Sequence, residues 1–324
     1  MSDSIGHVAA AAGRAATRID AFICNTPLAQ SPLFSSKTGA DVYLKLENLQ
    51  HTGSFKLRGA TNRLMTLSAA QRGDGCVTAS SGNHGAAVAC AMQKLEVHGV
   101  IFVPERTSPV KIEAIRSFDG DVRLFGSDGL ETEQHAREFA ERNSMVYLSP
   151  YNDAEVIAGQ ATCGIEIVEQ LPDVDAVFIA VGGGGLASGV GSVLRTHNPN
   201  IKIYGCQPQA SAIMAHSIEA GRIVDLPSEP TLSDGTAGGI EADAITFELC
   251  RELIDEFILV SEEEIANAMR LFINAHDQVI EGAAGVAIAA MLARAEHIAD
   301  KKVAVVVCGG NVSQETLESI RIKS

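Results

Sequence analysis

A lysine flanked by apolar residues is the feature of this sequence that most directly suggests covalent chemistry. Lys56 lies between Phe55 and Leu57 in the segment SFKLRGA, near the start of a predicted helix. A single lysine is usually a solvated surface group. Where its neighbours exclude water, however, the lysine pKa falls and the neutral amine becomes a nucleophile. Lys56 is therefore a candidate for a covalent bond to a carbonyl group.

A run of four glycines forms a candidate phosphate site. Gly182, Gly183, Gly184 and Gly185 follow an apolar run that is typical of a buried strand, and a helical pattern begins at Leu186. Unobstructed backbone N–H groups at the positive end of a helix can surround a phosphate. The run is not a P-loop, because no Gly-Lys-Ser/Thr follows, and its spacing does not fit the dinucleotide fingerprint. The alternative is a flexible loop tip, which the entropic cost of consecutive glycines disfavours.

Two further turns between predicted strands and helices carry polar groups. Residues 80–84 (SSGNH) precede an alanine-rich helix, and their hydroxyl, amide and N–H groups suit a carboxylate. The alternative there is simple N-capping by Ser81 or Asn83. Residues 308–311 (CGGN) follow another buried strand, where Cys308 alone would be an inert thiol. Ligands of open α/β sheets bind at such strand ends, and the four turns together offer what pyridoxal phosphate and an amino acid require.

The elements that position these turns alternate along the chain from about residue 75. Alternating strands and helices indicate an α/β fold of parallel sheets flanked by helices. Ser261 and Glu264 form a capping box at one helix start, and residues 229–241 form the longest irregular stretch. The predicted strands are 76–79, 97–103, 122–125, 145–148, 176–181, 201–206, 257–260 and 303–307; the predicted helices are 85–94, 109–118, 131–142, 157–170, 186–195, 211–220, 262–276 and 283–299.

Composition excludes several classes of partner. The chain has 25 Lys and Arg against 40 Asp and Glu, a net charge of −15, and no basic run, which argues against nucleic acid. Its seven cysteines are far apart, so we expect neither a disulfide framework nor a zinc site. Unpaired cysteines are typical of a reducing compartment, so we expect a cytoplasmic location. Residues 176–194 carry no charge, but the glycines divide them into strand, loop and helix, so we expect no membrane partner. Asp3, Gly13 and Arg14 make the N-terminus a short helix rather than a signal peptide.

The motifs SFKLRGA, SSGNHG, VGGGGL and CGGN resemble the signatures of fold-type II pyridoxal-phosphate enzymes, in the branch of serine/threonine dehydratases and serine racemases. Their order and spacing match over roughly residues 20–320. The resemblance implies pyridoxal phosphate as cofactor and a homodimer. It also implies two domains: a large one from residues 1–74 and 153–324, and a small one from residues 75–152.

The resemblance also implies roles for individual residues. Lys56 would hold the cofactor covalently and act as the catalytic base, Phe55 would cover the ring, Asn83 would bond its 3′-hydroxyl, and Cys308 would lie beside its ring nitrogen, where this branch commonly has serine. Ser81 matches the second catalytic group of racemases. The phosphate would be held by Gly182, Gly183, Gly184, Gly185 and Leu186, and the substrate carboxylate by Ser80, Ser81, Asn83 and His84.

Departures from the family pattern narrow these expectations. Residues 207–213 hold no carboxylate, and the next is Glu219, so the divalent metal of racemases is doubtful and we expect none. Thr132 stands where several relatives place a substrate-binding arginine, which disfavours an acidic substrate. The sequence ends at Ser324 without room for the regulatory domain of biosynthetic threonine deaminases, so we expect a catabolic, unregulated enzyme.

The expected activity is the dehydration and deamination of a β-hydroxy-α-amino acid such as L-threonine or L-serine. Its substrate could instead be a hydroxylated diamino acid from hydroxyectoine breakdown, because residues 233–240 (SDGTAGGI) resemble that group, or phenylserine. Serine racemisation is the alternative reaction. The alternative from another class is a non-catalytic protein that binds the cofactor or an amino acid.

Overall fold

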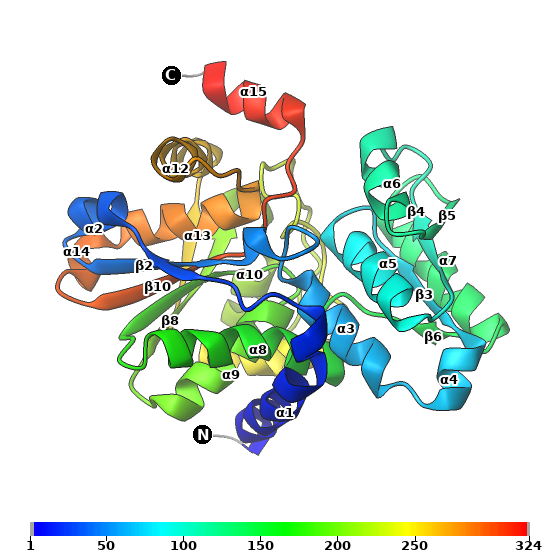
Figure 1. The fold of residues 1–324 in the computed structure, drawn as a ribbon. Coiled ribbons are helices and arrows are strands. Elements are labelled where there is room, and N and C mark those ends of the chain that lie inside the picture. The colour runs from blue at the N-terminus through cyan, green and yellow to red at the C-terminus, as the bar shows by residue number, and fades with distance from the viewer. Residues whose placement is uncertain (1–2, 323–324) are drawn as a thin grey trace.

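Two sheets, both largely parallel, organise the computed structural model, which describes residues 3–322 (Figure 1). The large sheet has six strands in the order β1-β2-β10-β7-β8-β9, of which only the edge strand β1 is antiparallel to its neighbour. The small sheet has the order β5-β4-β3-β6. The strands are β1 (Leu28–Gln30), β2 (Asp41–Leu46), β3 (Cys76–Ala79), β4 (Gly99–Val103), β5 (Asp121–Leu124), β6 (Val146–Tyr147), β7 (Ala176–Ala180), β8 (Lys202–Pro208), β9 (Glu256–Val260) and β10 (Lys302–Val307).

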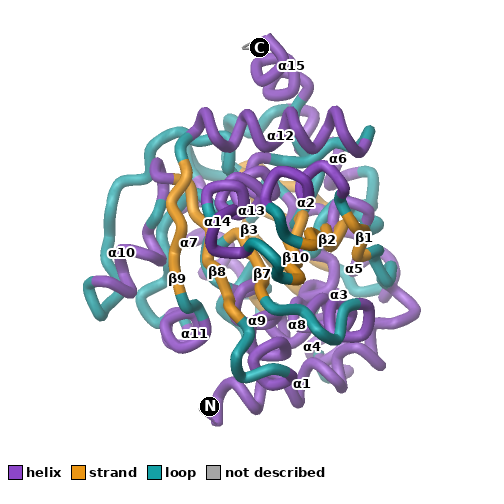
Figure 2. The backbone as a smooth tube through the Cα atoms, turned by 90° about the vertical axis from the view of Figure 1, so that its left-hand side faces the viewer, coloured by secondary structure: helices purple, strands orange, loops and turns teal. Residues whose placement is uncertain are grey.

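Helices cover both faces of the large sheet (Figures 1 and 2). α1 (Asp3–Ile19), α8 (Ala154–Gln170) and α9 (Gly185–His197) lie on one face, and α2 (Pro32–Thr38), α12 (Glu262–His276) and α13 (Gly282–Ala293) on the other. The small sheet packs with α5, α6 and α7. The remaining helices are α3 (Lys56–Thr66), α4 (Ala69–Asp74), α5 (Asn83–Leu95), α6 (Pro109–Arg116), α7 (Gly129–Arg142), α10 (Ile213–Glu219), α11 (Ile245–Leu253), α14 (Ala295–Ile298) and α15 (Gln314–Ile322), with 3-10 turns at Asp20–Phe22, Glu47–Leu49 and Gln209–Ser211.

The predicted α/β fold is confirmed, and most predicted elements are present with shifted ends. β4 starts at Gly99 rather than at residue 97, because the N–H of Val97 bonds back to the carbonyl of Met92 and closes α5. The helix expected over residues 283–299 divides at Arg294, whose backbone leaves the helical region. The capping box of Ser261 and Glu264 is confirmed, and the irregular stretch between α10 and α11 extends to residue 244. The domain bounds at 74/75 and 152/153 stay a prediction.

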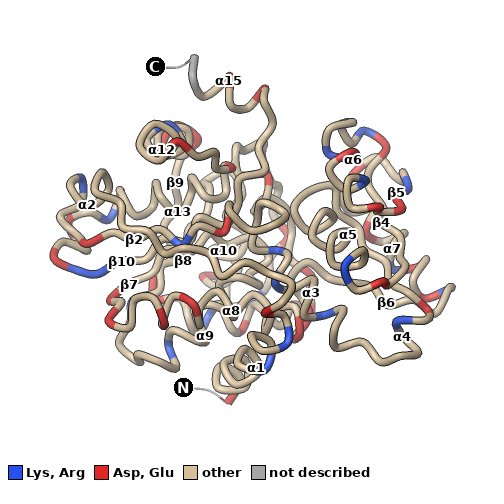
Figure 3. Tube along the Cα trace, viewed as in Figure 1, with Lys and Arg blue, Asp and Glu red and all other residues tan. Residues whose placement is uncertain are grey.

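The described chain has no helix long and apolar enough to cross a membrane. Residues 176–194 form β7, a glycine loop and α9, as predicted. All seven cysteines are free thiols. Lys and Arg are interspersed with Asp and Glu along the chain (Figure 3).

A buried ionic cluster joins β2, α3 and α8 beneath the start of α3. The Arg58 guanidinium, two residues after Lys56, contacts Glu47 at 2.7 Å and Glu166 at 2.6 Å, and Lys45 contacts Glu166 at 2.5 Å. Lys45, Glu47 and Arg58 are fully buried. Burial alone would raise the pKa of Glu47, but the charge and hydrogen bonds of Arg58, together with Thr26 and Lys45, outweigh it and lower this pKa. The cluster therefore fixes the first turn of α3 against the large sheet.

Replacing Arg58 by leucine should destabilise the fold by about 3–5 kcal/mol, because Glu47 would stay buried without its main cationic partner. The free energy of unfolding in urea measures this change. Arg116→Leu is the control, because Arg116 forms an exposed ion pair with Glu113, and it should cost less than about 0.5 kcal/mol. Equal effects of the two substitutions would contradict a role for the cluster.

Candidate active site

Lys56 begins α3, and its amine is directed at the chain that leaves the small sheet. Lys56 Nζ donates a hydrogen bond to the carbonyl of Pro150 at 2.9 Å and lies 5.2 Å from the centroid of the Phe55 ring. Burial lowers its pKa to about 8, although the nearby Cys308 and Glu281 act in the opposite direction. The expectation of a desolvated amine is confirmed. At pH 7 about a tenth of this amine is uncharged and nucleophilic, far more than for a lysine in water.

The loop before Lys56 is paired with the turn after β10. The N–H of Phe55 bonds to the carbonyl of Cys308 at 3.1 Å, and the N–H of Gly310 bonds to the carbonyl of Gly53 at 2.9 Å. Cys308 is buried, with 2% of its surface exposed. Burial and the neighbouring Glu281 raise the pKa of its thiol well above the ordinary value, so the thiol is protonated. Two of the four predicted turns thus lie side by side.

The glycine turn connects β7 to α9, as predicted. Gly184 has φ +85°, a left-handed backbone conformation that residues other than glycine rarely adopt. A Cβ on Gly183 would lie 2.4 Å from the Tyr151 ring, and one on Gly182 would lie 3.0 Å from the backbone of Thr236. The first N–H groups of a helix have no partner within it and form its positive end. The turn before Gly185 and Leu186 is therefore a backbone cradle suited to an anion.

Residues 150 and 151 connect this cradle to the lysine. Pro150 accepts the Lys56 hydrogen bond, and the next residue, Tyr151, packs against Gly183 and Gly185. The Tyr151 hydroxyl in turn accepts a hydrogen bond from the N–H of Glu241 at 2.9 Å. The nucleophile and the anion cradle consequently face the same space.

The turn that starts α5 supplies polar groups from the small sheet. Its N-cap is Gly82, and no side chain caps the helix, so the interpretation of Ser81 or Asn83 as a simple N-cap is wrong. The Ser80 hydroxyl accepts from the N–H of Gly82 at 3.3 Å, and Ser81 is half-buried. The free N–H groups of this helix start remain available to a carboxylate.

His84 lies in the first turn of α5 and is buried. Its Nε2 lies 3.0 Å from the carbonyl of Leu148, which requires the proton on Nε2, and burial lowers its pKa to about 3. Its Nδ1 is buried and has no hydrogen-bond partner among the described residues. A neutral imidazole in this tautomer offers only a lone pair at Nδ1. The His84 backbone N–H, rather than its side chain, is therefore the group suited to the predicted carboxylate.

Asn83 contacts a carboxylate that the sequence motifs do not include. Asn83 Nδ2 lies 2.9 Å from both carboxylate oxygens of Glu281, and its Oδ1 accepts from Asn311 at 2.7 Å. Burial raises the pKa of Glu281 to about 7, although the Asn83 hydrogen bonds lower it. Glu281 is 4% exposed. A charged residue before an apolar helix (EGAAGVAIAA) is the one signal in the sequence for this contact.

Other features lie outside the site. Thr132 is buried, and its hydroxyl donates to the backbone carbonyls of Phe125, which follows β5, and of Asp128, the N-cap of α7. In the described part of the chain, no group of three or more His, Cys, Asp or Glu side chains is arranged to hold a metal ion.

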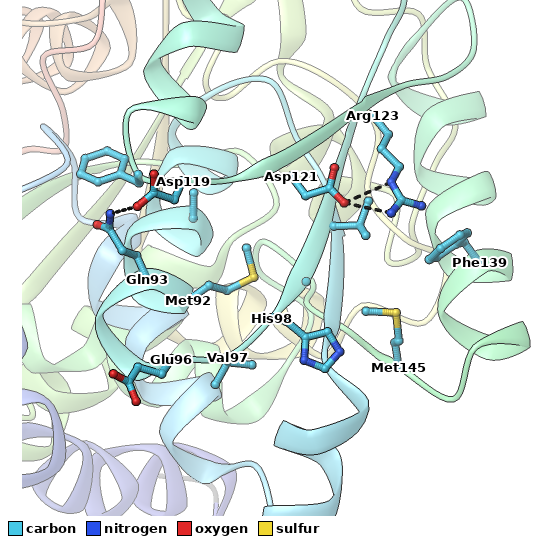
Figure 4. A pocket seen from close by; sticks show the side chains of 14 residues that line it. Met92, Gln93, Glu96, Val97, His98, Asp119, Asp121, Arg123, Phe139 and Met145 are labelled. Carbon is cyan, nitrogen blue, oxygen red and sulfur yellow. Dashed lines mark hydrogen bonds and ion pairs between the residues drawn. The ribbon is translucent and has the colours of Figure 1, made fainter.

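A hollow of about 690 Å³ lies at the amino ends of β4 and β5, beside His98 and Arg123. It is at the opposite end of the small sheet from the α5 turn (Figure 4).

Comparison with known proteins identifies the group that these features hold. The family model described as pyridoxal-phosphate dependent enzyme matches residues 19–309. The chain belongs to this family. A nucleophilic lysine and a glycine cradle for a phosphate fit that cofactor. The chain is thus dependent on pyridoxal phosphate.

Relatives place the chain in the branch of serine/threonine dehydratases and serine racemases. It is 41% identical to an L-threonine ammonia-lyase of Thermotoga maritima, over 91% of this chain and 73% of the relative. It is 36% identical to the catabolic L-threonine dehydratase TdcB of Escherichia coli, over 94% and 92%. The solved structure of threonine deaminase isoform 2 from Solanum lycopersicum superposes with a TM-score of 0.94 at 35% identity, covering 99% of this chain and 93% of that one. Maize serine racemase superposes with a TM-score of 0.90 at 30% identity, covering 97% and 96%.

The rate at which Lys56 bonds covalently to pyridoxal phosphate should rise with pH and level off above about pH 8, because only the neutral amine reacts. An ordinary lysine would continue to gain reactivity up to about pH 10.4. The growth of the visible cofactor absorbance after mixing with cofactor-free protein measures the rate, and borohydride reduction followed by peptide mass mapping locates the bond. A rate still rising well above pH 8, or a bond to another lysine, would contradict the assignment.

Gly183→Ala should weaken the affinity for pyridoxal phosphate at least about tenfold, because the added methyl group would displace the Tyr151 ring from the cradle. Gly73→Ala is the matched control, since a Cβ there meets nothing within 4 Å. Equilibrium titration of the cofactor-free proteins gives both dissociation constants. Equal affinities for the two variants would show that the cradle does not hold the phosphate.

Proposed function

We propose that this chain is a pyridoxal-phosphate-dependent ammonia-lyase that converts L-threonine or L-serine into a 2-oxo acid and ammonia. The observation that carries the proposal is the juxtaposition of the Lys56 amine, whose pKa burial lowers to about 8, with the buried, protonated thiol of Cys308. The named activities of the threonine ammonia-lyase and dehydratase relatives support it.

The cofactor would be held at three points. Its phosphate would bind the N–H groups of the turn at residues 182–186, and its aldehyde carbon would bond to Lys56. Phe55 would cover its ring, and Cys308 would lie beside the ring nitrogen. Bound pyridoxal phosphate supplies an electron sink for charge that develops on the substrate Cα. The protein contributes orientation, desolvation and proton transfer.

Lys56 would move the proton that starts the reaction. Lys56 would become a free amine when the amino group of the substrate replaces it at the aldehyde carbon. The neutral amine would then accept the Cα proton, and a base with a pKa near the working pH does so most efficiently. The β-hydroxyl would then leave as water, with the proton that Lys56 accepted from Cα. Tautomerisation of the resulting enamine and hydrolysis, which consumes one water, release the 2-oxo acid and ammonia. Atoms balance, because the water lost equals the water added.

Cys308 would determine the fate of the charge left on Cα once its proton is removed. A carboxylate beside the ring nitrogen would keep that nitrogen protonated and strengthen the electron sink. The buried, protonated thiol does not do so. Charge therefore stays concentrated at Cα, which favours prompt loss of a β-leaving group over transamination.

The start of α5 would orient the substrate by its carboxylate. Ser80, Ser81, Asn83 and the backbone N–H of His84 surround this positive helix end, and its side chains do not cap it. A substrate bound there by its carboxylate would have its Cα facing Lys56, which the large sheet positions.

Serine racemisation is the second candidate. The Ser81 hydroxyl is half-buried and free of a capping role, so it could exchange a proton on the face of Cα opposite Lys56. The likeness to maize serine racemase is consistent with such a reaction.

We also propose a catabolic enzyme that acts as a cytoplasmic homodimer without a catalytic metal. Seven free cysteines support a reducing compartment. The dimer rests on the family resemblance, and light scattering of the purified protein tests it.

A panel of β-hydroxy amino acids tests the proposed function. We expect L-threonine or L-serine to yield 2-oxo acid, and Lys56→Ala to lose at least about a thousandfold in kcat because it removes both the cofactor bond and the base. Phenylserine and a hydroxylated diamino acid belong to the panel, and chiral chromatography monitors D-serine. D-serine without oxo acid would establish the racemase instead. No product from any member would favour a binding protein.

A further inference from the structure

Glu281 is a buried carboxylate to which the proposed reaction assigns no step. It occupies the N-cap position of α13, where a side chain often bonds to the free N–H groups of the helix. The Glu281 carboxylate makes no such bond. It contacts Asn83, at the start of the helix α5 that packs on the small sheet.

The Glu281 carboxylate fixes the orientation of the Asn83 amide. Asn83 Nδ2 lies 2.9 Å from each Glu281 oxygen, while Asn83 Oδ1 accepts from Asn311 Nδ2 at 2.7 Å. A flip of the amide would direct Oδ1 at the carboxylate and Nδ2 at a donor, so both contacts would become repulsive. Asn311 is itself held by the carbonyl of Thr52 at 2.8 Å, close to Lys56 in the chain.

The turn after β10 is shaped around the same carboxylate. The N–H of Glu281 bonds to the carbonyl of Gly309 at 3.1 Å, and Cys308 Sγ lies 3.8 Å from Oε1. A Cβ on Gly309 would lie 2.7 Å from Oε1, so only glycine leaves room for the carboxylate. The backbone of the CGGN motif therefore leaves space for the Glu281 carboxylate next to Cys308.

Burying a carboxylate is costly unless it is hydrogen-bonded. Here the cost is offset by the two contacts of the carboxylate to Asn83 and by its contacts to Cys308 Sγ and to the backbone N–H of Asn311 in the turn after β10. From this arrangement we propose that Glu281 is a positioning residue that acts through Asn83: it orients the Asn83 amide toward the cofactor and fixes the α5 turn against the Cys308 turn. This role rests on the proposed function of Asn83 as a cofactor ligand.

Cofactor affinity in a double-mutant cycle tests this role without any substrate. We expect E281Q to weaken the affinity for pyridoxal phosphate about 10- to 100-fold, because the glutamine amide group would face the Asn83 amide group. In an N83A background the same substitution should change affinity less than about twofold, because the residue it acts through is gone. E248Q, on the exposed surface of α11, is the control.

A second variant separates positioning from loss of folding. Gly309→Ala keeps the charge but displaces the carboxylate, so it should reproduce the loss of affinity, while thermal unfolding of each cofactor-free variant reports on the fold. Equal effects of E281Q with and without Asn83, or unchanged affinity in both E281Q and Gly309→Ala, would overturn the inference. Failure of the proposed function would appear instead as an inactive wild-type protein that binds the cofactor normally.

Discussion

The structure depends on keeping one amine out of water. Lys56 can act as nucleophile and base only if its pKa falls toward neutrality, and burial is the force that lowers it to about 8. Burial of an amine is unfavourable for stability, so its surroundings must be held firmly. The ionic cluster around Arg58 holds the first turn of α3 in place, and the hydrogen bond between the Phe55 and Cys308 backbones holds the loop before Lys56.

The same desolvation drives the neighbouring groups toward their neutral forms. Burial lowers the pKa of His84 to about 3, raises that of Glu281 to about 7, and keeps Cys308 protonated. A site with few fixed charges suits a cofactor whose charge is carried mainly by its phosphate. That phosphate matches a glycine backbone cradle and a helix terminus, which explains how a chain of net charge −15 can hold an anionic ligand.

Local sequence was sufficient for the parts that depend on local chemistry. The glycine turn, the desolvated lysine and the alternation of strands and helices follow from neighbouring residues, and the structure contains all three. Before residue 75 the sequence predicts only a short N-terminal helix and a helix that starts near Lys56. It does not predict the strands there, because β1 and β2 are short and the buried charges of Lys45, Glu47 and Arg58 interrupt the apolar pattern. Contacts between distant residues, such as Asn83 with Glu281, carry no periodic signal. The His84 tautomer likewise depends on the carbonyl of Leu148, which no spacing rule identifies.

A crystal structure of the protein with pyridoxal phosphate tests the central claim most directly. We expect continuous electron density from Lys56 Nζ to the cofactor, with the phosphate at the N–H groups of residues 182–186 and the ring nitrogen beside Cys308. Density that joins the cofactor to another lysine, or a phosphate bound away from the glycine turn, would contradict this claim.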